Sequence, residues 1–268
     1  MRRIEDISSG DQAILGQSSA PVVVEALDLK KTYFGKVDVP VLFGIDLQIR
    51  AAEFVAVIGP SGSGKTTLLN VLGALDLPTS GKVLINGIDT SALAEDELAA
   101  LRNDEVGFIF QGHCLLDKFS CVENVLMPLT IRQGEPTDEQ RERAILLLNR
   151  VGLGDQLHKL PDEMSGGQNQ RCAMARALAH EPKVVLADEP TGDLDRRSGN
   201  QFLETMREMN RESGVAFVMV THDDRIAQTA DRILLIEDGL IQQISKDEHR
   251  RKSAGVVRSS LNSVGTGQ

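Results

Sequence analysis

A glycine-rich segment that ends in lysine and threonine carries the clearest chemistry in the sequence. It runs Gly59, Pro60, Ser61, Gly62, Ser63, Gly64, Lys65, Thr66 and matches the pattern G-x-x-x-x-G-K-[ST] at every fixed position. Glycines let the backbone curl so that successive N–H groups point at phosphate oxygens, while the lysine adds positive charge and the hydroxyl can bind Mg²⁺. The segment therefore predicts a phosphate-binding loop, and we include Thr67, the next residue, in the same nucleotide site.

Two adjacent acids follow an apolar run further along the chain. Lys183–Ala187 is followed directly by Asp188 and Glu189. Such a run predicts a buried parallel strand, and ligands of open α/β sheets bind at the carboxyl ends of these strands. Asp188 suits the Mg²⁺ shell, and Glu189 suits the orientation or deprotonation of a water molecule. A solvated strand end is the alternative, which the nearby phosphate-loop pattern disfavours.

The elements that must position these residues include two kinds of strand. Alternating runs at Val22–Leu27, Val41–Ile49 and Lys82–Ile88 predict antiparallel strands near the start. Glu53–Ile58 is instead continuously apolar, and it leads through the glycine-rich segment into the helical pattern of Thr66–Leu72. These two features predict a buried parallel strand that feeds a helix through a tight loop.

The middle of the chain is predicted to be helical. Thr137 with Gln140 forms a capping-box pattern before one helix, and Ser165 with Gln168 forms another before a helix that reaches Ala179. Buried-strand runs return at Lys183–Ala187 and Val215–Val220, separated by a helical stretch. The predicted fold class is therefore an α/β core interrupted by a helical insertion at about residues 112–179.

The composition argues against several classes of protein. The 268 residues carry 29 Lys and Arg against 39 Asp and Glu, and a net charge of −10 disfavours a protein that coats nucleic acid. Aromatic residues make up 3% of the chain, so a stacking surface for single strands is not expected. The longest apolar runs are strand-sized, so any membrane-spanning part is expected on another chain. The three cysteines form no CxxC pair, as is typical of a reduced cytosolic protein.

With Ser165, Gly166, Gly167 and Gln168 upstream of the apolar-Asp-Glu strand, the chain resembles ATP-binding-cassette (ABC) ATPases. The resemblance covers roughly residues 22–242. It implies a P-loop fold with a RecA-like parallel-sheet core, an N-terminal antiparallel β subdomain and an inserted α-helical subdomain. The implied organisation is a polar extension at 1–21, the nucleotide-binding domain at 22–245 and a basic tail at 246–268. That tail is expected to be mobile because Ser, Gly and basic residues dominate it.

The resemblance also implies roles for single residues around ATP and Mg²⁺. Tyr33 would stack on the adenine, although an ordinary packed tyrosine is the alternative. Gln111 would join the Mg²⁺ and water shell together with Thr66 and Asp188. His222 would hold the geometry of the γ-phosphate, beside Glu189 as the group that polarises the attacking water.

A second copy of the chain is the first partner that the resemblance implies. In the family, two cassettes form a head-to-tail dimer, and Ser165, Gly166, Gly167 and Gln168 of one copy meet the γ-phosphate held by the other. Asp195 is the last acid of the segment Asp193-Leu194-Asp195, which comes shortly after Glu189, and it would lie at the same interface. Two residues depart from the usual pattern, because Met164 replaces leucine and Asp193 replaces a small or amide residue. The Ser165–Gln168 pair can serve equally as a helix cap.

The second implied partner is an integral membrane permease. Residues 102–111 and 123–129 resemble the bacterial lipoprotein-release and macrolide-export subfamily, which also includes a cell-division ATPase. This implies a peripheral location on the cytoplasmic face of the inner membrane, with Leu115–Leu129 as the surface that docks on the permease or, alternatively, as core of the insertion. Export or extraction of a lipoprotein, lipid, peptide or drug is one implied function. Regulation of a membrane partner in cell-wall control, without cargo, is the other.

Overall fold

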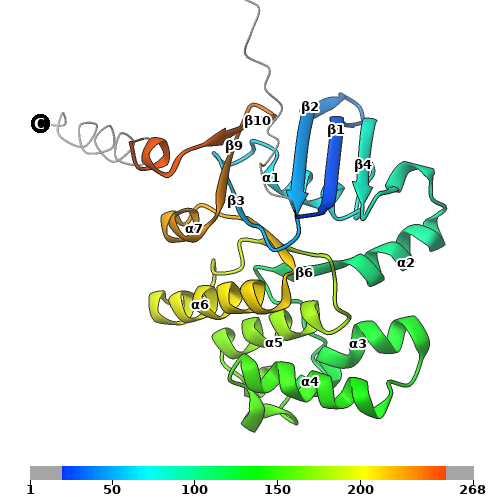
Figure 1. Ribbon diagram of the computed structural model, residues 1–268, viewed down its shortest axis with the longest axis vertical. Helices are drawn as coiled ribbons and strands as arrows, with labels where there is room; N and C mark the ends of the chain where they lie inside the picture. Colours follow the sequence, from blue (N-terminus) through cyan, green and yellow to red (C-terminus); the bar gives the residue numbers. More distant parts are fainter. Residues whose placement is uncertain (1–19, 252–268) are drawn as a thin grey trace, which may run out of the picture.

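Two β-sheets and the helices packed against them make up the described part of the chain (Figure 1). The computed structural model describes residues 20–251. The strands are β1 (Val22–Tyr33), β2 (Val39–Arg50), β3 (Phe54–Ile58), β4 (Ser80–Ile85), β5 (Ile88–Asp89), β6 (Val106–Phe110), β7 (Val184–Asp188), β8 (Ala216–Val220), β9 (Arg232–Glu237) and β10 (Leu240–Ile244). The helices are α1 (Lys65–Leu72), α2 (Glu95–Glu105), α3 (Cys121–Gln133), α4 (Asp138–Arg150), α5 (Gly166–Leu178), α6 (Arg196–Ser213) and α7 (Asp224–Thr229).

The larger sheet contains the buried parallel strands that the sequence predicts. Its order is β10-β9-β3-β8-β7-β6, in which only the edge strand β10 runs antiparallel to its neighbour. Every residue of β3 and of β8 is buried, as expected for central strands of a sheet that is covered on both faces. The predicted parallel core is confirmed.

The smaller sheet is antiparallel and covers one face of the larger one. Its order is β2-β1-β4-β5, which confirms the antiparallel strands predicted near the start. Helix α1 packs into the core between the sheets, where Leu69 of α1 belongs to the same buried cluster as Leu29 of β1 and Val218 of β8. The phosphate-loop helix is thus held from both sides by apolar contacts.

The opposite face of the larger sheet is covered by helices. Figure 1 shows α5 and α6 next to the sheet, with α3 and α4 further out. One buried cluster joins these layers and includes Val125, Leu148, Met174 and Phe217, which come from α3, α4, α5 and β8. All three cysteines are free, and Cys121 and Cys172 are buried between α3 and α5.

The predicted helix starts are present at both capping boxes. Thr137 N donates to Gln140 Oε1 at 2.9 Å and Gln140 N donates to Thr137 Oγ1 at 3.3 Å, before α4. Ser165 and Gln168 make the same reciprocal pair at 2.8 and 3.3 Å before α5. Because each box satisfies two N–H groups that the helix itself leaves free, the sequence signal alone locates these helix ends.

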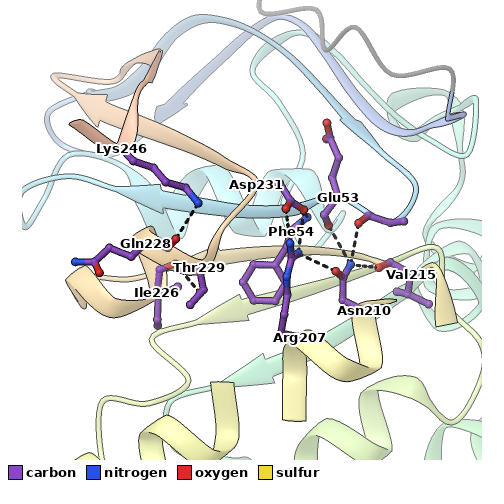
Figure 2. Close-up of polar contacts among 11 residues, drawn as sticks. Glu53, Phe54, Arg207, Asn210, Val215, Ile226, Gln228, Thr229, Asp231 and Lys246 are labelled. Carbon is purple, nitrogen blue, oxygen red and sulfur yellow. Dashed lines mark hydrogen bonds and ion pairs between the residues drawn. The ribbon is translucent and has the colours of Figure 1, made fainter. Parts of the chain in front are cut away.

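The C-terminal half of α6 is tied to the strand that leads into the phosphate loop (Figure 2). Asn210 is buried and donates from Nδ2 to Val215 O at 2.8 Å and to Ala52 O at 3.1 Å. Arg207 pairs with Asp231, whose Oδ2 also accepts from Phe54 N at 3.0 Å. These contacts fix the start of β3 relative to α6.

Two segments differ from the expectations. The sequence pattern does not predict α2, because only Leu98 and Leu101 of this helix are buried and so narrow an apolar stripe gives no clear helical period. Residues 246–251 were expected to be mobile but form a helix, with Ser245 N donating to Glu248 Oε2 at 2.7 Å and Lys246 Nζ donating to Gln228 O at 2.8 Å. The extension up to residue 19 and the tail from residue 252 lie outside the described residues.

Candidate functional site

The strand register brings the candidate residues to one edge of the larger sheet. Phe110 of β6 pairs with Asp188 of β7, and Asp188 pairs with Val220 of β8. The residues that follow these strands, Gln111, Glu189 and Thr221 with His222, therefore leave the sheet side by side. Strand β3 pairs with β8 and ends at Ile58, so the phosphate loop starts at the same edge.

The phosphate loop is shaped by glycine backbone conformations and by Lys65. Gly64 has φ 101°, which an L-residue rarely adopts, and helix α1 begins immediately after it. An ideal Cβ on Gly59 would lie 2.1 Å from Ile236 O, so only glycine fits against β9. Lys65 Nζ donates to Gly59 O at 3.0 Å and to Pro60 O at 2.8 Å, which folds the ammonium group back over the loop.

The loop retains polar groups that a phosphate would satisfy. Ser63 is buried, and its Oγ has no hydrogen-bond partner among the described residues. A buried hydroxyl without a partner is unfavourable unless a ligand completes it. An ideal Cβ on Gly62 would meet no atom within 4 Å, so the side of the loop at Gly62 is open. The geometry fits an anionic group beside the N-terminus of α1.

Thr66 and Asp188 form the polar pair next to the loop. Thr66 Oγ1 donates to Asp188 Oδ2 at 3.0 Å, across 122 residues of sequence. Burial raises the pKa of Asp188, and the nearby Glu189 charge adds to this, while the Thr66 hydrogen bond and the Lys65 charge act in the opposite direction. A hydroxyl and a carboxylate are the oxygen ligands that Mg²⁺ prefers, so this pair fits that cation together with phosphate oxygens. Within residues 20–251, no group of three or more His, Cys, Asp and Glu forms a metal cluster by itself.

Glu189 and His222 lie next to each other at this edge. His222 Nδ1 is 2.6 Å from Glu189 Oε2, and the His222 side chain is 76% exposed. Glu189 has φ 47°, an unusual left-handed conformation for a non-glycine residue, and its N–H donates to Val220 O at 3.0 Å. Strained backbone conformations of this kind are typical of functional sites, and here the strained residue is Glu189 itself, in the turn after β7.

Gln111 is joined to the turn that precedes α6. Its Nε2 donates to Asp193 Oδ1 at 2.8 Å. Asp195, two residues later, is the N-cap of α6 and accepts from the N–H groups of Arg197 and Ser198 at 2.9 and 3.1 Å. Hydrogen bonds from Ser198 hold the pKa of Asp195 below its usual value.

The segment at Ser165 is held by α6. An ideal Cβ on Gly167 would lie 3.3 Å from Ser198 Cβ, whereas one on Gly166 would meet nothing within 4 Å. Gly167 therefore packs against the start of α6, and Gly166 faces open space. These contacts are made to α5 and α6 rather than to the phosphate loop of the same chain.

Tyr33 lies at the end of a strand of the smaller sheet, and its side chain also hydrogen-bonds to Asp76, which follows α1. Tyr33 is the last residue of β1, is 42% exposed and has Lys31 Nζ 4.9 Å from its ring centroid. These contacts do not join it to the phosphate loop, so adenine stacking by Tyr33 stays a prediction.

Comparison with known proteins identifies the family. Residues 42–192 match the model of the ABC transporter family. The lipoprotein-releasing system ATP-binding protein LolD of Anaeromyxobacter dehalogenans is 46% identical over 241 residues, which cover 90% of this chain and 100% of that protein. The structure of the ATP-binding cassette MJ0796, a dimer bound to ADP and Pi in a post-hydrolysis state, matches with a TM-score of 0.76 and 39% identity over 83% of this chain and 98% of that one. The chain belongs to the ABC transporter family.

This ABC cassette is an ATP hydrolase of the lipoprotein-release and macrolide-export subfamily, as predicted. The macrolide export ATP-binding/permease protein MacB of Syntrophobacter fumaroxidans is 50% identical over 222 residues. Those residues cover 82% of this chain but only 31% of the MacB protein, so the cassette spans about a third of that relative. None of the helices in residues 20–251 of the cassette has the length and hydropathy of a membrane span.

Two residues of the ABC cassette support the site without having been predicted. Gln170 of α5 donates from Nε2 to Phe110 O at 2.8 Å. Arg176 of the same helix donates to Cys114 O at 2.6 Å and to His113 O at 2.9 Å. His113 and Cys114 both have positive φ, so Arg176 holds a strained turn after Gln111. Nothing in the local sequence separates these two side chains from the ordinary polar residues of a helix.

Proposed function

We propose that the chain is the ATP-binding and ATP-hydrolysing subunit that drives a separate permease in the bacterial inner membrane, from its cytoplasmic face. The observation that carries this proposal is the convergence of the phosphate loop, Thr66–Asp188 and Glu189–His222 at one sheet edge. The relatives named for lipoprotein release and macrolide export favour a lipoprotein, lipid, peptide or drug as the cargo.

The residues at the sheet edge divide the work on ATP. The N–H groups of the loop and Lys65 bind the phosphates and lower the repulsion met by an attacking nucleophile. Thr66, Asp188 and Gln111 would hold Mg²⁺, which would neutralise negative charge on the phosphate oxygens. Glu189 accepts a hydrogen bond from the attacking water, and His222, whose Nδ1 lies 2.6 Å from Glu189 Oε2, keeps that carboxylate in place beside the γ-phosphate.

The complete site uses two copies of the chain. Gly166 faces open space and Gly167 is anchored on α6, which leaves the N-terminus of α5 free to meet an anion on another molecule. The solved relative MJ0796 is a dimer. We therefore place Ser165, Gly166, Gly167 and Gln168 on the γ-phosphate bound by the second copy, with Asp195 at the same interface.

The permease contact is narrower than the whole of Leu115–Leu129. Leu115, Val125, Leu126 and Leu129 are buried in the helical cluster and belong to the core. Leu116 and Phe119 are 42% and 39% exposed, in the loop between Gln111 and α3. These two side chains are the apolar surface that we assign to the permease.

The nucleotide part of the proposal is tested with Lys65→Ala. The purified parent chain should bind a fluorescent ATP analogue and release phosphate from ATP in the presence of Mg²⁺. The variant loses the only lysine of the loop, and we expect it to lose analogue binding while its melting temperature without nucleotide stays close to that of the parent. Retained binding by Lys65→Ala would remove the phosphate-loop assignment.

A further inference from the structure

The side chain of Gln111 is held by the turn between β7 and α6 in two ways. Asp193 Oδ1 accepts a hydrogen bond from Gln111 Nε2 at 2.8 Å. An ideal Cβ on Gly192 would lie 3.0 Å from both Cδ and Nε2 of Gln111, so the backbone of the turn packs directly against the amide group. The amide is thus restrained by a polar partner and by close packing at the same end.

The chemistry of these groups determines which end of the amide faces the turn. An ionised carboxylate only accepts hydrogen bonds, so the end of Gln111 beside Asp193 must be the NH₂ group. The remaining end is the carbonyl oxygen Oε1. Mg²⁺ takes oxygen ligands, and an amide NH₂ group cannot serve as one.

We propose that Asp193 is a positioning residue that fixes the amide orientation of Gln111, so that Oε1 rather than Nε2 is offered to the Mg²⁺ of the nucleotide. The inference rests on the proposed function, because it takes Gln111 as part of the Mg²⁺ shell. The small or amide residue that is usual at this position would restrain the amide less. A small side chain leaves it free to rotate, and an amide side chain can pair with either end of it.

The size of the effect follows from what each substitution leaves behind. Asp193→Ala frees the glutamine side chain, and loss of a partner that orients a ligand commonly weakens metal binding about tenfold or more. Because the Gln111–Asp193 contact is exposed and phosphate oxygens supply other ligands, we expect a loss of about 3- to 10-fold. Asp193→Asn still accepts from Nε2 but also permits the reversed amide, so the competent fraction falls to about a half and the loss is about twofold.

The test measures a divalent cation directly, in addition to hydrolysis. Mn²⁺ replaces Mg²⁺, and its binding to the full-length chain is followed by electron paramagnetic resonance with a non-hydrolysable ATP analogue. Parent, Asp193→Ala and Asp193→Asn are compared alone and in a Gln111→Ala background. We expect the two Asp193 substitutions to weaken Mn²⁺ binding in the first series and to change nothing in the second, because Asp193 acts through Gln111.

Gly192→Ala gives a second, independent variant. Gly192 is not among the residues with positive φ, so alanine suits the backbone and its Cβ acts only by displacing the flexible end of Gln111. This variant should also weaken Mn²⁺ binding, and only when Gln111 is present. Melting temperatures of all variants check that the fold is unchanged.

The outcomes separate this inference from the proposed function. If the parent chain binds no Mn²⁺ with the analogue, the site assignment fails and the inference fails with it. If the parent binds Mn²⁺ and Asp193→Ala binds it equally well, the inference alone is overturned. It is also overturned if Asp193→Ala weakens binding by the same factor with and without Gln111.

Discussion

The two acids that follow β7 differ in their surroundings although they are adjacent in sequence. Asp188 is partly buried, accepts from Thr66, and has a raised pKa because it is removed from water. Glu189 turns away through a left-handed backbone and meets His222 instead. Neighbouring carboxylates in different environments can perform different tasks, and the tasks that we propose are cation binding for Asp188 and water activation for Glu189.

Glu189→Gln tests the second of these tasks. The amide keeps the shape of the side chain but cannot accept a proton, so turnover should fall on the order of 10²-fold or more while ATP binding is kept. Phosphate release measures the turnover, and a fluorescent ATP analogue measures the binding. Hydrolysis at the parental rate would show that Glu189 does not activate the water molecule.

Asp188→Asn should move stability and function in opposite directions. The folded pKa of Asp188 is raised above its ordinary value, so the folded protein holds this proton more tightly than the unfolded chain, and stability is lost as the pH rises through the folded pKa. Asparagine removes that loss and still accepts from Thr66. The nucleotide-free variant should therefore melt higher than the parent near neutral pH, and the gain should shrink as the pH is lowered toward about 4, because the parental carboxyl takes up its proton as the pH falls.

Scanning fluorimetry at both pH values, with Mg²⁺-dependent phosphate release on the same samples, makes the measurement for Asp188→Asn. A carboxylate that binds a cation destabilises the fold in the absence of that cation, which is why the variant should gain stability and lose activity. A lower melting temperature at neutral pH would mean that the attraction to Lys65 outweighs the burial of Asp188.

At the level of helices and strands, patterns of neighbouring residues in the sequence predict most of the elements but few of the side-chain contacts between elements. The capping boxes at Thr137 and Ser165, the apolar strands and the phosphate loop are contiguous patterns, and the structure contains each of them. Asn210 and Ala52 are 158 residues apart, and Gln111 and Asp193 are 82 residues apart. No spacing rule joins such pairs, because only the sheet order brings them together.

Asn210 provides a prediction about this long-range anchoring. Asn210 donates to the carbonyl groups of Ala52, just before β3, and Val215, just before β8 (Figure 2). Ala52 also has a positive φ. Asn210→Leu fills a similar space but leaves the buried Val215 carbonyl and the partly buried Ala52 carbonyl without this donor, which costs about 1–3 kcal/mol of the free energy of unfolding. Urea denaturation measures the change, and Gln201→Leu on the exposed face of α6 is the matched control, with an expected effect within about 0.5 kcal/mol. Equal effects of the two variants would contradict an anchoring role.

At the scale of the whole molecule, the two parts of the proposed nucleotide site lie on separate regions of one chain. The phosphate loop and the acids lie at the sheet edge, while the turn at Ser165 is fixed on α6 with Gly166 facing open space. The loop after Gln111 connects both parts, because Gln170 and Arg176 of α5 hold its backbone. A partner that presses on this loop acts at once on the Gln111 side and on the helix that carries Ser165.

The exposed side chains of that loop supply the last prediction. Leu116 and Phe119 lie between the strained turn held by Arg176 and the start of α3. A permease bound there would therefore contact the loop that connects Gln111 at the sheet edge to helix α5. Leu116→Ser and Phe119→Ser should each reduce co-purification of the membrane partner about tenfold or more, since a buried apolar anchor at an interface contributes about 1.4–2 kcal/mol or more. Leu146→Ser, on α4 and 62% exposed in the chain, is the matched control.

The measurement is quantitative mass spectrometry of the permease recovered with each tagged cassette from solubilised membranes. An equal loss with Leu146→Ser would indicate a general effect of surface polarity, and full recovery with both loop variants would place the permease elsewhere on the cassette.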